Sequence, residues 1–432
     1  MPHPHPRDCL FNCLLLVIST YVKFANSSHI EQPGGTVIAS ALHGYSMSIA
    51  WAPWRSGLEA GAKSGVDLQI LDDKGKPVAW GDLEIEAERK LHCMVMGEDL
   101  STFLHIHVED AAMLGQGDMP ADSDTTLILP ISLPGEGRYV AGIEVEVGGK
   151  AHVAYAPLRA LAPPPIPGLD TSKIPRLAHP ARTLTPPFPA VSAVRSVPMQ
   201  MGADGKVVGR LEYINLTDIA MPWPAPASFP PDSFNPAYVV QLSIAPFQPG
   251  GKGVGGVAAA GEQLPGLKPG VCYAFSLKIM AYPSKEPITD LVPYLGHAMH
   301  LAAVPHASLW ILDHFHAMVA GMHPAHGAGE GGVTPCDLGD EAMPEAPASF
   351  GPDLMGYYSF SAPGIYRLVA QSVQKGGHMA LPHWFVNVAE PPQPPRPSSS
   401  LQNAGQLQAA VNGRGVLVVA IAAALAVLGL VV

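Results

Sequence analysis

The density of proline and glycine constrains the fold of this chain more than any other feature. Its 432 residues include 46 Pro and 44 Gly, and both residue types interrupt long helices. Between the two chain ends, the sequence shows short runs of alternating apolar and polar residues, as in Val66–Leu71, Tyr139–Val147 and Tyr366–Ala370. This alternation is typical of antiparallel β-sandwiches and predicts an all-β fold.

The second half of the chain repeats the first in a divergent form. Three blocks occur in the same order in both halves: Tyr45–Pro53 with Tyr238–Pro246, Lys76–His92 with Lys285–His300, and Pro134–Gly149 with Pro363–Gly377. We therefore predict two antiparallel, immunoglobulin-like β-sandwich modules at residues 42–160 and 236–390. A Pro-rich linker joins them at 161–190, and residues 191–235 are assigned as an extension of the second module.

The two chain ends predict export and anchoring. Residues 1–25 carry an apolar stretch too short to span a membrane comfortably, which indicates a signal peptide, with a retained signal anchor as the alternative. Residues 391–405 form a Pro/Ser stalk. Residues 406–432 contain a polar spacer and an apolar tail with no basic residue after it, which favours a glycosylphosphatidylinositol anchor signal, with a transmembrane helix second. Both interpretations put the folded part outside the cell.

Charge and cysteine content narrow the function further. The net charge is −11 and no Lys/Arg block occurs, so nucleic-acid binding is not expected. Sequons at Asn26 and Asn215 fit a secreted glycoprotein. After removal of the signal peptide three cysteines remain, and an odd number in an oxidising compartment suggests one bridge and one free thiol. We expect the bridge between Cys272 and Cys336, which leaves Cys93 free.

A His-x-His pair on a predicted strand is the first candidate site. Strand alternation puts His105 and His107 on one face of the strand. The apolar residues Leu104, Ile106 and Val108 lie on the other face. The apolar face is the natural core face, so the two imidazoles point away from the core. They lie about 7 Å apart along the strand, a separation that two imidazoles can close onto one ion. His92, on the neighbouring strand, is the third candidate ligand.

The second half offers the same arrangement. His314 and His316 form the pair, and His300 is the candidate third ligand. Methionine sulfur from Met94 and Met299 would favour copper over zinc. The alternative is a polar strand face without metal, in which the methionines fill the core.

The segment Met94–His107, with His92 ahead of it, resembles a motif of secreted bacterial proteins with a YtkA-like, cupredoxin-like β-sandwich. Pro293–His300 is similar to that family's Pro-Tyr-Leu-Gly segment, and Ala362–Leu368 is similar to its later Pro-Gly-x-Tyr strand. The resemblance implies a β-sandwich and metal or copper handling at the cell surface.

The chain departs from the family pattern at two places. In the first copy, Val108 stands where the family has proline. In the second copy, one extra residue lies between His300 and His314, which could change the pairing of its strands and makes the first pair the stronger prediction. The sequence thus predicts a surface-anchored extracellular protein that binds a transition metal, copper favoured, without catalysis. A structural or adhesive surface protein without metal is the alternative, and no enzyme motif is found. The candidate metal ligands are His92, His105, His107, His300, His314, His316, Met94 and Met299.

Overall fold

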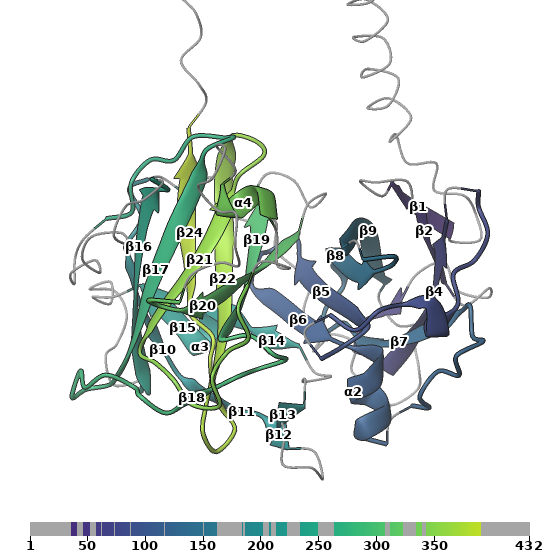
Figure 1. The fold of residues 1–432 in the computed structure, drawn as a ribbon, viewed down its shortest axis with the longest axis horizontal. Coiled ribbons are helices and arrows are strands. Elements are labelled where there is room, and N and C mark those ends of the chain that lie inside the picture. The colour runs from purple at the N-terminus through teal and green to yellow at the C-terminus, as the bar shows by residue number, and fades with distance from the viewer. Residues whose placement is uncertain are drawn as a thin grey trace, which may run out of the picture. The chain divides into compact units, whose positions relative to one another are not determined.

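Antiparallel strands dominate the described part of this computed structural model, which confirms the all-β prediction (Figure 1). The structure describes residues 36–40, 46–51, 58–61, 63–72, 74–86, 88–115, 117–149, 151–161, 184, 186–201, 207–208, 213–222, 234–248, 263–306, 312–322, 334–338 and 343–389. They all belong to one compact unit that ends at Pro391.

Several predicted segments lie outside the described residues. They are the signal peptide at 1–25, the stalk at 391–405, the anchor segment at 406–432 and almost all of the linker at 161–190. Within the described part of the chain, no helix has the length and apolar character that a membrane crossing requires.

The first half forms two sheets. Its strands are β1 (Thr36–Ser40), β2 (Ser46–Trp51), β3 (Leu58–Glu59), β4 (Lys63–Leu71), β5 (Leu91–Gly97), β6 (Thr102–Ile106), β7 (Leu127–Ser132), β8 (Gly137–Glu146) and β9 (Ala151–Leu161). One sheet has the order β1-β2-β4-β7, and the other has the order β14-β6-β5-β8-β9-β3, where β14 is Ile214–Asn215. The short helices η1 (Trp80–Asp82) and α2 (Val108–Met113) connect strands of this half.

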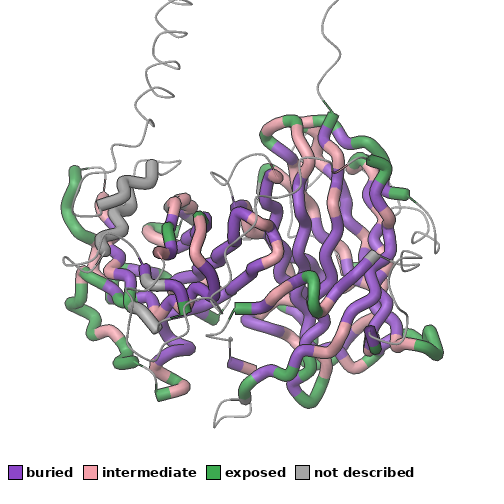
Figure 2. The backbone as a smooth tube through the Cα atoms, turned by 180° about the vertical axis from the view of Figure 1, so that it is seen from behind, coloured by how far each residue is buried: buried purple, intermediate pink, exposed green. Residues whose placement is uncertain are grey.

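Alternate residues of the two sheets fill a shared core in the first half. Leu68 of β4 and Leu129 of β7 belong to the same buried cluster as Val95 of β5 and Ile106 of β6. Each fully buried side chain of this kind stabilises the fold by about 1.5–3 kcal/mol. The strands at the centre of each half are the most buried parts of the chain (Figure 2).

The second half also places two layers around one core. Its remaining strands are β10 (Val191–Val194), β11 (Ser196–Pro198), β12 (Gln200–Met201), β13 (Val207–Val208), β15 (Ala220–Pro222), β16 (Tyr238–Pro246), β17 (Cys272–Ala281), β18 (Leu291–Val292), β19 (Met299–Pro305), β20 (Asp313–Val319), β21 (Asp353–Ser359), β22 (Gly364–Gln374), β23 (His378–Ala380) and β24 (His383–Val388). Its short helices are α3 (Leu216–Ile219) and α4 (Pro335–Leu338). Pairing of β20 with β21 joins the layers into one path of strands.

Corresponding strands pair in the same way in both halves. The order β6-β5-β8-β9 recurs as β20-β19-β22-β24. The hydroxyl of Tyr139 donates to the carbonyl of Gly135 at 2.8 Å, and that of Tyr366 donates to the carbonyl of Ala362 at 2.9 Å. A tyrosine bonded four residues back along the chain is the tyrosine corner of β-sandwich proteins. The shared pattern supports the predicted repeat, while the module boundaries stay a prediction.

The region assigned as an extension of the second module contacts both halves. Strands β10 and β15 pair with each other, and β10 pairs with β16 of the second half. Strand β14 instead pairs with β6 of the first half, where Ile214 lies opposite Phe103.

The histidine face of the first half points away from its own core and is buried against the second half. All seven residues of β5 are buried. Cys93 and Val95 face the core of the first half, whereas Met94 and Met96 belong to a third cluster that spans both halves. From the second half this cluster includes Tyr294, Ala302, Val304, Leu312, Val369 and Val373.

Backbone approach at this interface is close enough to require glycine. A Cβ at Gly142 of β8 would lie 2.6 Å from the carbonyl oxygen of Leu312. Polar contacts also cross the interface: Arg367 donates to the carbonyl of Leu100, and the hydroxyl of Tyr155 donates to Asp313.

The cysteine prediction is confirmed. Cys272 and Cys336 form a disulfide, and Cys93 is a buried free thiol. Burial raises the pKa of the Cys93 thiol to about 12. Its side chain also lies in the core of the first half, on the face of β5 opposite His92, so Cys93 is not a candidate ligand.

Candidate metal centre

Seven histidines gather where the two halves meet. Three come from the first half and four from the second: His92, His105, His107, His297, His300, His314 and His316. His92 lies on β5, His105 on β6 and His300 on β19. Strand alternation directs these rings to the interface because their apolar neighbours occupy the cores.

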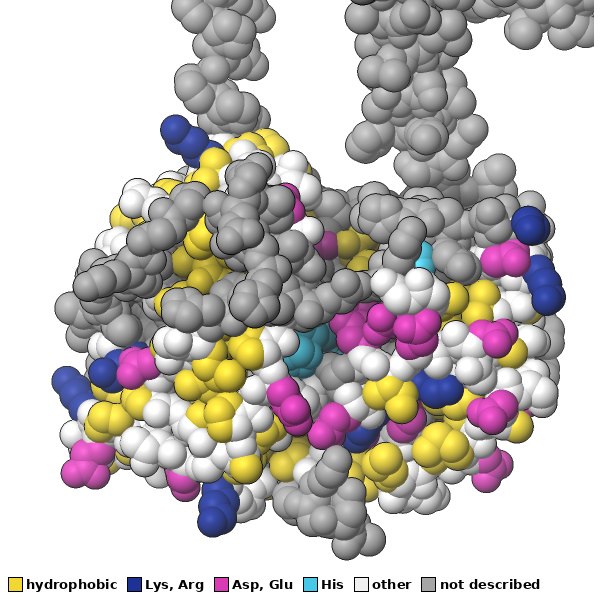
Figure 3. Space-filling model, in the orientation of Figure 1, with side chains coloured by type: hydrophobic (Ala, Val, Ile, Leu, Met, Phe, Trp, Pro, Cys, Tyr) yellow, Lys and Arg dark blue, Asp and Glu magenta, His cyan; other side chains and the backbone are white. Residues whose placement is uncertain are grey.

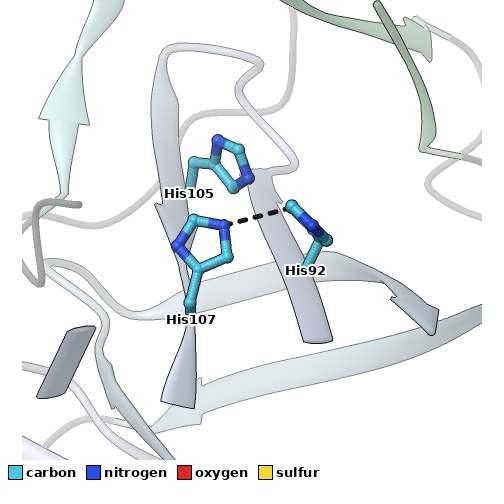
Figure 4. A group of neighbouring side chains, drawn as sticks. All are labelled: His92, His105 and His107. Carbon is cyan, nitrogen blue, oxygen red and sulfur yellow. Dashed lines mark hydrogen bonds between the residues drawn. The ribbon is translucent and has the colours of Figure 1, made fainter. Parts of the chain in front are cut away.

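The first set is His92, His105 and His107 (Figure 4). One ligand atom from each ring lies within 4.8 Å of the other two. Nε2 of His107 lies 3.2 Å from Nδ1 of His92. Imidazole nitrogens bound to one tetrahedral ion lie about 3.3 Å apart, given metal–nitrogen bonds of about 2.0–2.1 Å. Strand β6 ends at Ile106, and His107 continues it with extended backbone before α2.

The outward nitrogen of each ring in the first set has an acceptor. Nε2 of His92 donates to the carbonyl of Glu86 at 3.0 Å, and Nδ1 of His107 donates to Asp110 at 2.5 Å. Nδ1 of His105 lies 2.7 Å from Oε1 of Gln371. These bonds assign the protons to the outward nitrogens, so three lone pairs converge. Acceptors placed behind imidazoles orient metal-binding histidines in the same way.

The second set is His300, His314 and His316. Nδ1 of His300 lies 3.0 Å from Nε2 of His314 and 3.1 Å from Nε2 of His316. Nε2 of His300 donates to the carbonyl of Tyr294 at 2.7 Å, and Nδ1 of His314 donates to Glu144 at 2.6 Å. Nδ1 of His300 and Nε2 of His314, the ring nitrogens that these two donors leave without a proton, therefore face each other as lone pairs.

Two groups of three histidines have ligand atoms within 4.8 Å of one another, and only the first group agrees with a predicted set. His105, His300 and His314 form such a group, which takes its members from both halves. His316 belongs to neither group, although its ring stacks on His297 at 3.7 Å between centroids. The sequence suggested two separate sites, and the structure brings both pairs to one place.

Two buried carboxylates support the rings. Asp110 is fully buried and also accepts from Arg89 at 2.8 Å. Burial alone would raise the pKa of Asp110, but His107 and Arg89 outweigh burial and lower it. Glu144, on β8 of the first half, is 6% exposed and contacts His314 of the second half.

Burial keeps the imidazoles of four histidines of this centre neutral. It is the main cause that lowers the pKa of His92, His105, His300 and His316 well below the usual value, and neighbouring histidines lower the pKa of each further. Neutral rings with lone pairs about 3 Å apart repel one another unless a cation lies between them. Nε2 of His105 is buried and has no hydrogen-bond partner among the described residues. The site therefore has the donor chemistry that a transition metal needs.

The same buried histidines predict a pH effect on the metal-free protein. Their lowered folded-state pKa values mean that the unfolded chain binds more protons between those values and about pH 6.5. We therefore expect stability to be complete above about pH 6.5 and to fall as the pH decreases below it. Circular dichroism melts between about pH 8 and 5 measure this. A melting temperature that stays the same over this pH range would contradict the prediction. The control is His378→Ala, which removes a histidine at an exposed position.

The predicted methionine ligands differ in position. Met94 lies directly opposite His105 on the paired strand, and both face the interface. Met299 lies in the core of the second half, on the face opposite His300. Two further histidines differ in burial: His378 of β23 is exposed, whereas His383 of β24 is buried.

Four supporting residues were not predicted from the sequence: Asp110, Glu144, Gln371 and His297. Asp110 follows His107 by three residues, a spacing that is a recognisable signal once a helix is known to start there. Glu144 and Gln371 lie on strands beside the histidine strands, but the histidine that each one contacts belongs to the opposite half. No local pattern predicts such a contact.

Comparisons with known proteins do not assign a family. No protein-family model matches the chain, and no curated protein gives a significant match. Two solved structures align over most of it. One is the native conformation of the Escherichia coli alpha-2-macroglobulin, with 12% identity and a TM-score of 0.16 over 80% of this chain. The chain spans 26% of that protein's length.

The other is a predicted membrane-anchored protein from Corynebacterium diphtheriae. It has 11% identity and a TM-score of 0.15, over 82% of this chain and 95% of that one. Similarity at this level carries no argument about function. The resemblance to YtkA-like proteins therefore stays a prediction.

Proposed function

We propose that this protein binds a transition metal ion without catalysis, and that it captures, buffers or delivers the ion. One observation carries the proposal: the lone pairs of three buried imidazoles converge in the first set while acceptors hold their outward nitrogens. Buried, neutral histidines arranged in this way are costly for the metal-free fold. A bound ion relieves the repulsion between their lone pairs.

Copper is our first choice of metal. Imidazole donors suit copper, zinc, iron and nickel, and Cu(II) has the highest intrinsic affinity among the divalent ions. Met94 on the histidine face adds a thioether that favours Cu(I). Met299 gives no such support because it faces the core. Zinc is the competitor that a titration must separate from copper.

We expect the purified full-length chain to bind copper more tightly than zinc, and His105→Ala to weaken binding. Removal of a ligand should cost at least the roughly 10–100-fold in affinity that loss of a supporting partner costs. Calorimetric titration with Cu(I), Cu(II) and Zn(II) measures this. The exposed His378→Ala variant is the matched control. Unchanged metal uptake after alanine replaces His105, His107, His314 and His316 together would contradict the proposal and favour a structural or adhesive role.

We also propose that the protein acts at the cell surface, held there through its C-terminal anchor. The predicted signal peptide and anchor segment support this, as does the disulfide between Cys272 and Cys336, because such bonds persist in oxidising compartments. Treatment of intact cells with a phosphatidylinositol-specific phospholipase should release the protein into the medium. Retention in the membrane fraction would indicate a transmembrane anchor instead.

A further inference from the structure

The two histidine sets occupy equivalent positions in the two halves. His92 pairs with Glu144 across β5 and β8, and His300 pairs with Gln371 across β19 and β22. His105 lies opposite the residue two positions after His92. His314 lies opposite the residue two positions after His300. The two sets are therefore related as the two sides of a pseudo-two-fold interface.

Backbone contacts follow the same relation. His92 and His300 each donate from Nε2 to a carbonyl six residues earlier in the chain, at Glu86 and Tyr294 respectively. The other ring nitrogen, Nδ1, faces the second histidine of the His-x-His pair in the same half. Nδ1 of His92 lies 3.2 Å from Nε2 of His107, and Nδ1 of His300 lies 3.1 Å from Nε2 of His316. Equivalent rings thus point their lone pairs in equivalent directions.

The supporting contacts are exchanged between the halves. Gln371 of the second half holds Nδ1 of His105 in the first half at 2.7 Å. Glu144 of the first half holds Nδ1 of His314 in the second half at 2.6 Å. Each half therefore orients a histidine of the other, and neither set is complete without the interface.

The distances from His105 to two rings of the second set fall within the range of distances inside a set, where ring centroids lie between 4.3 and 6.0 Å apart. Ring centroids of His105 and His314 are 5.5 Å apart, and those of His105 and His300 are 5.4 Å apart. Within the first set, His92 and His105 are 6.0 Å apart. In two-metal sites the ions lie about 3.5–4 Å apart, so their ligands must come from neighbouring side chains, as the two sets are here.

Ligand number and charge also suit two ions. Seven imidazoles exceed the four ligands of one tetrahedral ion. Each set has one buried carboxylate bonded to one of its rings, Asp110 at His107 and Glu144 at His314. Figure 3 shows histidine atoms in a recess that acidic side chains border, and a border of this charge attracts cations.

We propose that the seven histidines form one centre that binds two transition metal ions together, with His105 positioned to serve either ion. This inference rests on the proposed function, since it assumes that the histidines bind metal. A pair of ions at this separation would also take a small bridging anion such as hydroxide. Because each half supplies a residue that orients a histidine of the other half, binding of both ions would stabilise the contact between the two halves.

Loading the full-length chain with Cu(II), used as the probe whatever the physiological metal, tests the proposal. We expect two copper ions per chain by mass spectrometry of the metal, and an electron paramagnetic resonance signal that accounts for much less than two isolated spins or shows a half-field transition. Azide, a bridging anion, should change the absorption spectrum. The exposed His378→Ala variant should behave like the wild type.

Variants of one set distinguish one centre from two. The double variants His92→Ala/His107→Ala and His300→Ala/His316→Ala should each bind one ion with a full isolated spin. The wild-type measurement stands even if a variant does not fold. No bound copper would overturn the proposed function itself. One ion per chain would leave metal binding intact and overturn the two-ion centre, as would two ions with two full, isolated spins.

Discussion

Replacement of Asp110 by asparagine is expected to destabilise the protein by about 3–5 kcal/mol, the usual cost when one partner of a buried ion pair is removed. Asp110 is fully buried and accepts from both Arg89 and His107. Without its charge, the Arg89 guanidinium stays buried at 6% exposure with no carboxylate to balance it in this pair. Urea denaturation of the metal-free protein measures the change.

The same variant should weaken metal binding by about 10–100-fold, because His107 loses the carboxylate that orients it. Lys278→Ala is the matched control: both partners of its ion pair with Asp353 are partly exposed, at 32% and 47%, and such pairs contribute about 0–1 kcal/mol. A free energy of unfolding for Asp110→Asn as close to wild type as that of the control would show that the buried network is not a stabilising unit.

Replacement of Gly142 by alanine is expected to separate the two halves at the histidine centre. The new Cβ would lie 2.6 Å from the Leu312 carbonyl oxygen and 3.2 Å from its side chain, so the strands must shift. Overpacking of this kind costs about 1–3 kcal/mol. Glu144 and His314 lie two residues beyond Gly142 and Leu312, so the shift should also break their 2.6 Å contact and weaken metal binding.

Thermal melts and copper titration of Gly142→Ala, beside Gly266→Ala, test this. A Cβ at Gly266 meets no atom within 4 Å, so that change should stay within about 0.5 kcal/mol. Wild-type copper affinity in a folded Gly142→Ala protein would mean that contact between the halves is not needed for the metal centre.

Local sequence patterns were sufficient for the strands and for the face of each histidine. Alternation along Leu104–Val108 correctly separated the core residues from His105 and His107. The same reasoning at Phe315 and Ala317 separated the second core from His314 and His316. These predictions succeed because successive side chains of a strand point to opposite faces, a property of the backbone that needs no tertiary information.

Strand alternation could not predict which surface packs against the histidine face. Met94, Met96 and Phe103 share that face, and their apolar character is a signal of burial on both sides of the strand. Such a signal does not identify the partner. Proximity in sequence to the histidines favours Met299 as a ligand, but alternation puts its side chain on the face opposite His300.

The sequence by itself determined the all-β fold, the disulfide between Cys272 and Cys336, and the orientation of each histidine relative to its own core. Only the tertiary structure decided that the two histidine faces meet, that His105 and His314 are held by residues of the opposite half, and that Asp110 and Glu144 supply the buried charge. The physical reason is the distance along the chain over which each property is determined. Side-chain direction follows from the local backbone, whereas contact between two sheets depends on the packing of complete surfaces.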